Sequence, residues 1–180
     1  MAPPPPVSLP PHKPLFLLTG LWALASPLVW LWPGLVADPA FWHLHEFFFG
    51  MAAAAIGGYL LTALPHRAGA ATSLSALCLL VLAWIAGRGA LLWPDATPAT
   101  RLALALSYPV ILCLLLATPL LRARAWGRIW MAVLPLALAG SEAAVLAAHL
   151  RGEAPASAPL ALTLGFTLMI GLIGGRIVPA

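Results

Sequence analysis

The chain has 180 residues, of which 62% are hydrophobic and 8% are charged, and its mean hydropathy is +0.98. A soluble domain of this composition would expose large apolar patches, so the composition excludes an ordinary water-soluble fold. The formal net charge is +4, but the nine cations form no basic stripe, which excludes a nucleic-acid-binding surface. The two cysteines, Cys78 and Cys113, lie in apolar segments and predict no disulfide framework.

Residues 1–14 are rich in proline and predict a disordered leader. Six apolar segments follow, near residues 15–36, 39–65, 72–93, 102–121, 129–150 and 158–178. Each has roughly the 20 residues that a helix needs to cross a hydrocarbon core of about 30 Å, and backbone groups in lipid must pair within their own segment. We therefore predict an all-α, polytopic transmembrane bundle of about six helices in residues 15–180, with sequence neighbours packed as antiparallel hairpins.

The cations are distributed unequally between the two ends of the predicted bundle. One end carries Lys13, Arg67, Arg122, Arg124, Arg128 and Arg176. The opposite end carries Arg101 and Arg151, together with Asp38, Asp95 and Glu153. The positive-inside rule places the first end, and with it both termini, in the cytoplasm. We expect a multi-pass protein of the cell inner membrane whose main partner is the lipid bilayer.

The second apolar segment holds several ionisable residues near the end opposite the cytoplasm. It opens with Asp38-Pro39, which predicts a helix N-cap followed by proline at the first helical position. His43, His45 and Glu46 follow within two turns. Helical spacing places His43 and Glu46 on one face and turns His45 elsewhere. A regular helix therefore cannot easily bring both histidines to one ion.

Two other segments contribute Arg88, Glu142 and His149 to the same half of the bilayer. Glu142 and His149 are seven residues apart and share a helical face. Ionisable groups inside a membrane are costly and are functional candidates by default. Imidazole suits haem iron, copper and zinc, and Arg88 could neutralise a haem propionate or pair with Glu46. Alternatively, the histidines could be hydrated at the interface and the ion pair purely structural.

Small residues recur every fourth position along the second segment, at Gly50, Ala54, Gly58 and Thr62. Small side chains at this spacing allow a neighbouring helix, or a flat cofactor, to approach closely. Helix packing is the commoner use of such a row.

Several of these residues lie in patterns that are similar to those of a known family. Residues 42–46 (WHLHE), followed by Phe49-Gly50 and residues 58–63 (GYLLTA), resemble the W-H-x-H-E … F-G … G-[FY]-L-L-T-A signature of the NnrS family. Residues 84–88 resemble its W-x-x-x-R, and residues 174–179 resemble its G-G-R-[IV]-[IV]-P element. The resemblance implies a membrane protein that binds haem, and possibly copper, and is linked to nitric oxide metabolism and nitrosative stress.

The resemblance and the placement of the polar residues together lead to a set of expected site residues. We expect the metal or axial haem ligands to be among His43, His45 and His149. We expect the cofactor site also to involve Glu46, Arg88, Glu142 and Arg176. No activated nucleophile or hydrolytic constellation is present in the sequence, so an enzyme is not predicted.

The length of the chain differs from that of the family. NnrS proteins have about twice as many helices, with further spans after the G-G-R-x-x-P element, whereas this sequence stops at Ala180. We therefore expect an amino-terminal half, a truncated product, or a half-size relative that dimerises. The alternative functions are half of a small-molecule transporter, with Glu142 and Arg88 lining the path, and a membrane scaffold for a respiratory complex.

Overall fold

The computed structural model describes residues 10–32, 34–68, 72–153 and 162–167 of the chain. All the regular structure in these ranges is helical, which confirms the predicted fold class. The elements in chain order are α1 (His12–Ala25), the 3₁₀ segment η1 (Ser26–Leu31), α2 (Pro39–His45), the π-helical segment η2 (Glu46–Ala52), α3 (Ala53–Ala68), α4 (Leu74–Leu92), α5 (Pro98–Arg122), the 3₁₀ turn η3 (Trp126–Arg128) and α6 (Trp130–Leu150).

Five of the described helical stretches are long and apolar enough to cross a membrane. They are His12–Leu31, Pro39–Leu64, Leu74–Leu92, Pro98–Arg122 and Trp130–Leu150. These stretches match the first five predicted segments. The sixth, near 158–178, lies mostly outside the described residues, of which 162–167 are helical. Because α1 begins at His12, the last three residues of the predicted leader are helical, whereas residues 1–9 lie outside the description.

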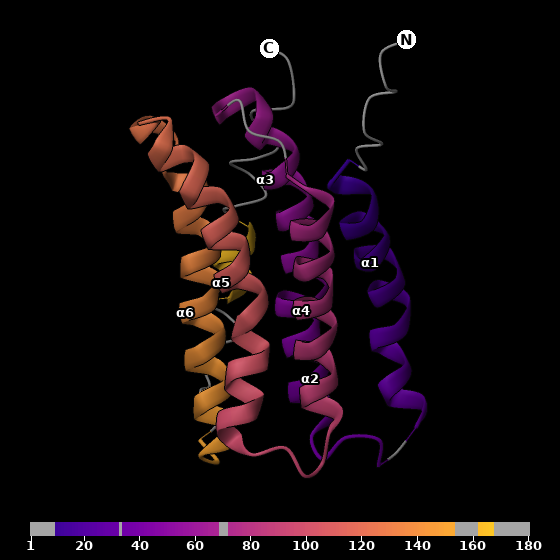
Figure 1. Ribbon diagram of the computed structural model, residues 1–180. Helices are drawn as coiled ribbons and strands as arrows, with labels where there is room; N and C mark the ends of the chain where they lie inside the picture. Colours follow the sequence, from indigo (N-terminus) through magenta and orange to yellow (C-terminus); the bar gives the residue numbers. More distant parts are fainter. Residues whose placement is uncertain (1–9, 33, 69–71, 154–161, 168–180) are drawn as a thin grey trace.

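The spans run up and down the molecule side by side (Figure 1). The connections 34–38 and 93–97 and the end of α6 lie together at the bottom of Figure 1, which we call the Asp38 end. The opposite end, where α5 stops, we call the Arg122 end. In the bundle α5 packs against both α4 and α6, while α1 packs along η2 and α3. The placement of the Arg122 end in the cytoplasm stays a prediction.

Side-chain caps fix where three of the spans begin. Asp38 Oδ1 accepts a hydrogen bond from the backbone N–H of Phe41 at 2.9 Å, and Pro39 stands at the first helical position, which confirms the predicted cap. Ser73 caps α4 and Thr97 caps α5 in the same way. These caps satisfy backbone donors that have no partner inside the helix.

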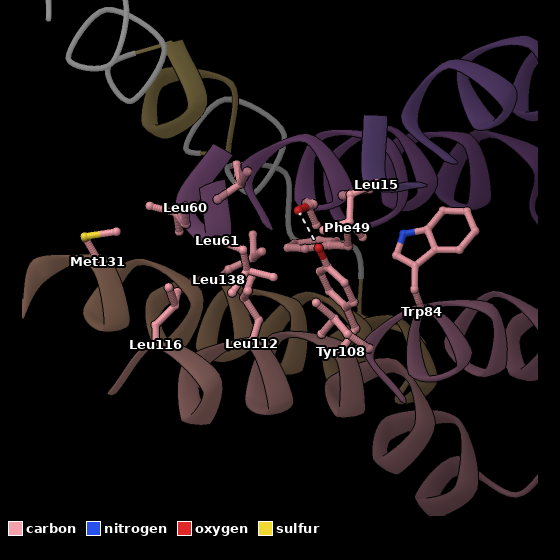
Figure 2. Packing of buried hydrophobic residues seen from close by; sticks show 14 of the residues in the cluster. Leu15, Phe49, Leu60, Leu61, Trp84, Tyr108, Leu112, Leu116, Met131 and Leu138 are labelled. Carbon is pink, nitrogen blue, oxygen red and sulfur yellow. Dashed lines mark hydrogen bonds between the residues drawn. The ribbon is translucent and has the colours of Figure 1, made fainter. Parts of the chain in front are cut away.

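The apolar core includes side chains from α1, η2, α3, α4, α5 and α6. Figure 2 shows Leu60 and Leu61 of α3 close to Leu112 on α5. Tyr108, one turn before Leu112, donates a hydrogen bond to the backbone carbonyl of Ala53 at 3.0 Å, drawn as a dashed line in Figure 2. Lipid tails are as apolar as leucine, so close packing and such hydrogen bonds hold these helices together.

The row of small residues on the second span packs against α1. A Cβ added to Gly58 would meet the Phe16 ring at 3.1 Å and Leu15 at 3.3 Å. Further along the row, Thr62 Oγ1 lies 3.4 Å from His12 Nδ1. The predicted close approach is therefore confirmed, and its partner in the structure is the first helix.

Candidate functional site

Four ionisable side chains from three different spans meet in the interior of the bundle. They are His45, Glu46, Arg88 and Glu142, all at most 3% exposed, and we call them the ionic cluster. α2 and η2 supply the first two residues, α4 supplies the arginine and α6 the second glutamate. The convergence predicted for Glu46, Arg88 and Glu142 is present in the structure.

The contacts within the ionic cluster form a continuous chain. His45 Nδ1 lies 3.1 Å from Glu46 Oε1, and His45 Nε2 lies 3.4 Å from Glu142 Oε1. Arg88 Nε lies 3.0 Å from Glu46 Oε2, and an Arg88 terminal nitrogen donates to Glu142 Oε1 at 3.3 Å. Each carboxylate therefore contacts both Arg88 and His45. Removing one member of the cluster leaves another buried charge uncompensated.

The π-helical segment η2 is supported by donors from α4. Arg88 donates a hydrogen bond to the carbonyl of Phe49 at 2.6 Å, and Trp84 Nε1–H donates to the carbonyl of Gly50 at 2.9 Å. Trp84 and Arg88 are four residues apart, so one face of α4 presents both donors. Short π-helical insertions within α-helices are often found at functional sites, and here the insertion begins at a member of the ionic cluster.

A tryptophan from α1 completes the environment of Glu46. Trp22 Nε1–H donates to Glu46 Oε2 at 2.7 Å. The Trp22 and Trp84 rings meet edge-on, with 5.3 Å between their centroids. A Cβ on Gly50 would lie 2.6 Å from Trp22 Nε1 and 2.7 Å from Glu46 Oε2. This hydrogen bond therefore requires glycine at position 50. Sequence reasoning missed Trp22, because no local spacing links α1 to the second span.

The three candidate histidines do not converge on one point. His45 lies inside the ionic cluster, whereas the His43 ring lies beside Trp30, with 6.1 Å between ring centroids. His149 stacks on Phe41, with 3.5 Å between centroids and 3° between the ring planes. Across the described residues, no group of three or more His, Cys, Asp or Glu side chains could hold a metal ion. Arg176 lies outside the described residues.

One expectation about helical faces is wrong. Spacing placed His43 on the face of Glu46 and turned His45 elsewhere, but the histidine that contacts Glu46 is its neighbour His45. The helix changes from α to π at Glu46, so the periodicity of 3.6 residues per turn does not hold there. The long Glu46 side chain also reaches sideways to the adjacent ring.

A small cavity lies at the Asp38 end, about one helical turn from the ionic cluster. Its lining comes from residues 36–38 and from α2, α4, α5 and α6, and includes Asp38, Arg101 and His149. Four lining residues stand one helical turn from the four members of the cluster: Phe41, Trp42, Leu91 and Leu146. These apolar and aromatic side chains form one layer between the cavity and the buried charges.

Five membrane-spanning stretches within the described residues, around a buried ionic cluster, define a multi-pass, α-helical membrane protein with a polar site inside the bundle. Comparison with known families makes this more specific: the family model described as NnrS protein matches residues 6–180. The chain belongs to the NnrS family. Neither the search of curated proteins nor the search of solved structures found a match.

Proposed function

We propose that this chain is a haem-binding membrane protein of nitric oxide metabolism or the nitrosative stress response, acting in the cell inner membrane. Membership of the NnrS family supports the proposal. The observation that carries it is the ionic cluster, because fully buried charges inside a membrane span are costly and are retained for function. The contacts within the cluster hold the helices of the Asp38 half in fixed positions. Side chains on these helices can then be held in place to bind a ligand.

Of the three candidate histidines, His43 fits an axial haem ligand best. Its Nδ1 has no hydrogen-bond partner among the described residues, so no carboxylate of the cluster competes with a metal for this ring. By contrast, both ring nitrogens of His45 face carboxylates. Haem iron accepts a single imidazole on each face and supplies the centre that binds small diatomic molecules. A copper site made only of protein ligands would need several donors together, and the described residues do not provide such a group.

The absorption spectrum and metal content of the purified full-length protein test this proposal. We expect a Soret band in the wild type that His43→Ala abolishes or shifts. The matched control is His12→Ala, a histidine on α1 that contacts Thr62 and lies outside the cluster. If the wild type contains neither haem nor metal, or if His43→Ala, His45→Ala and His149→Ala all keep the wild-type spectrum, the proposal is wrong.

The transporter alternative receives no comparable support. It required Arg88 and Glu142 to line a path, but these residues are 3% and 1% exposed and bind one another. Completion of the site by a second half or a second copy of the chain remains a prediction, which co-expression and co-purification would test.

A further inference from the structure

We propose that a groove between α4 and α5 at the Arg122 end binds a phospholipid with an anionic headgroup. The groove is lined by α3, by the residues that precede α4, and by α4 and α5, and its volume is about 290 Å³. Because one water needs about 10–15 Å³ of such volume, the groove has room for roughly 20 water-sized groups, and a methylene group is of similar size. Leu114, which lines the groove, is 59% exposed. The groove therefore opens on the surface that faces lipid and has room for part of an acyl chain.

The polarity of the groove changes along its length. Because α5 runs toward the Arg122 end, Leu114 and Leu115 lie deeper in the bundle than Thr118, which is about one helical turn nearer that end. Thr72 and Ser73 also line the groove and immediately precede α4, which begins at the same end (Figure 1). The groove is therefore apolar at depth and has hydroxyl groups at its rim. A phospholipid has the same order of acyl chain, ester groups and headgroup.

An exposed cation follows this rim on the same face of α5. Arg122 comes four residues after Thr118 and three after Pro119, both of which line the groove, and residues at these spacings share a helical face. The five acidic side chains of the chain all lie at the Asp38 end or in the ionic cluster: Asp38, Glu46, Asp95, Glu142 and Glu153. No acidic side chain therefore neutralises Arg122. A cation at the mouth of an apolar groove selects a lipid whose headgroup is negative.

The turn that ends α5 places a second cation at this end, in a strained backbone conformation. The Ala125 N–H donates to the Leu120 carbonyl at 2.9 Å and the Arg124 N–H to the Leu121 carbonyl at 3.0 Å, which is the pattern of a Schellman motif. The left-handed residue of this motif is usually glycine, but here it is Arg124, with a φ of 50°. The backbone would favour glycine, so we attribute the arginine to its charge. Nearby Trp126 is 64% exposed, as is typical of tryptophans at the level of lipid headgroups.

The test compares phosphatidylglycerol with phosphatidylcholine of the same acyl chains, both bound to the full-length protein and counted by native mass spectrometry. We expect the wild type to retain phosphatidylglycerol in preference to phosphatidylcholine at a saturable site. Arg122→Gln should lower this preference about fivefold, because a cation near an anionic membrane surface contributes about 1 kcal/mol. Arg151→Gln is the matched control, since it removes an exposed arginine at the opposite end and should leave the preference unchanged.

Arg124→Gly separates lipid binding from the stability of the fold. Glycine relieves the strain at this position, so the variant should keep or raise the free energy of unfolding and yet lower the preference for phosphatidylglycerol. A purely structural role of Arg124 would not produce this combination.

Bulky substitutions test the groove itself. Ala76→Phe places a ring in the groove and should abolish the preference. Ala137→Phe is its control, because Ala137 lines a second groove, of about 260 Å³, whose described lining holds no charged residue. This variant should keep the preference. The proposal is overturned if the wild type retains both lipids equally, if Arg122→Gln and Arg124→Gly both keep the full preference, or if Ala137→Phe acts like Ala76→Phe.

Discussion

The two halves of the second span are held in the bundle by different kinds of contact. In the half nearer Asp38 the backbone changes from α-helical to π-helical at Glu46, and side chains from α1 and α4 bind the Glu46 carboxylate and the freed carbonyls. Toward the Arg122 end it is an ordinary α-helix with buried leucines, such as Leu60 and Leu61. Both halves lie in the same lipid and share neighbouring helices. We therefore attribute the difference in their backbone conformation to the polar groups.

This contrast teaches how each half should respond to change. A buried polar network is stable only when every member is satisfied, so the loss of one partner affects the others. An apolar core loses only local contacts, and removing a single methyl group typically costs about 0.5–1.5 kcal/mol. The Asp38 half should therefore be sensitive to single substitutions and the Arg122 half more tolerant.

The largest effect is expected for Arg88→Leu. The substitution leaves Glu46 and Glu142 without their guanidinium and removes the donor to the Phe49 carbonyl. Breaking a buried ion pair by removing one partner costs about 3–5 kcal/mol. The free energy of unfolding, measured in mixed detergent micelles, should fall by this amount.

Arg122→Leu is the matched control for Arg88→Leu, because Arg122 is exposed at the end of α5, and it should change stability little. Adding Glu46→Gln to Arg88→Leu should recover part of the loss, since one stranded charge is removed. Wild-type stability in Arg88→Leu would show that the cluster does not hold the Asp38 half together.

The next effect is expected for Gly50→Ala. The added methyl group would lie within 2.7 Å of both Trp22 Nε1 and Glu46 Oε2, so α1 has to move. Overpacking of this kind costs about 1–3 kcal/mol. Gly140→Ala, where a Cβ meets nothing within 4 Å among the described residues, is the control and should be neutral or slightly stabilising. Equal stability of the two variants would contradict the close approach of α1.

A smaller effect is expected for Trp22→Phe, which keeps an aromatic ring but removes the donor to Glu46. Hydrogen bonds to charged groups contribute about 1.5–3 kcal/mol, part of which the retained ring packing and rearranged partners offset. We expect a loss of about 1–2 kcal/mol in the same unfolding measurement. Trp32→Phe, at a tryptophan that is 65% exposed, should leave the free energy of unfolding unchanged. An equal loss of stability in Trp32→Phe would show that the hydrogen bond from Trp22 to Glu46 is not what stabilises the protein.

The sequence predicted the parts of this molecule that depend on local rules. Apolar length located five spans, and Asp38-Pro39 located the start of the second. Because charges inside a membrane are costly, the sequence indicated that Glu46, Arg88 and Glu142 lie close together. The π-helix escaped prediction, because its support comes from Trp84 and Arg88 on another span, and a single sequence does not reveal long-range pairing. The histidine positions were misjudged for the same reason.

The smallest effect is expected outside the spans, where a polar pair is exposed instead of buried. Arg151 donates to both carboxylate oxygens of Glu153 at 2.8 Å, and these hydrogen bonds hold the pKa of the Glu153 carboxyl below its usual range. Because the folded pKa is lowered, the contribution of the pair is present at neutral pH and is lost as the pH falls through that pKa. Arg151→Gln should raise the pKa of Glu153 toward its ordinary value, as followed by ¹³C NMR of its carboxyl group. At neutral pH the same variant should unfold like the wild type, since water screens exposed pairs. A loss of stability as large as that of Trp22→Phe would show that burial does not separate the strong polar contacts of this protein from the weak ones.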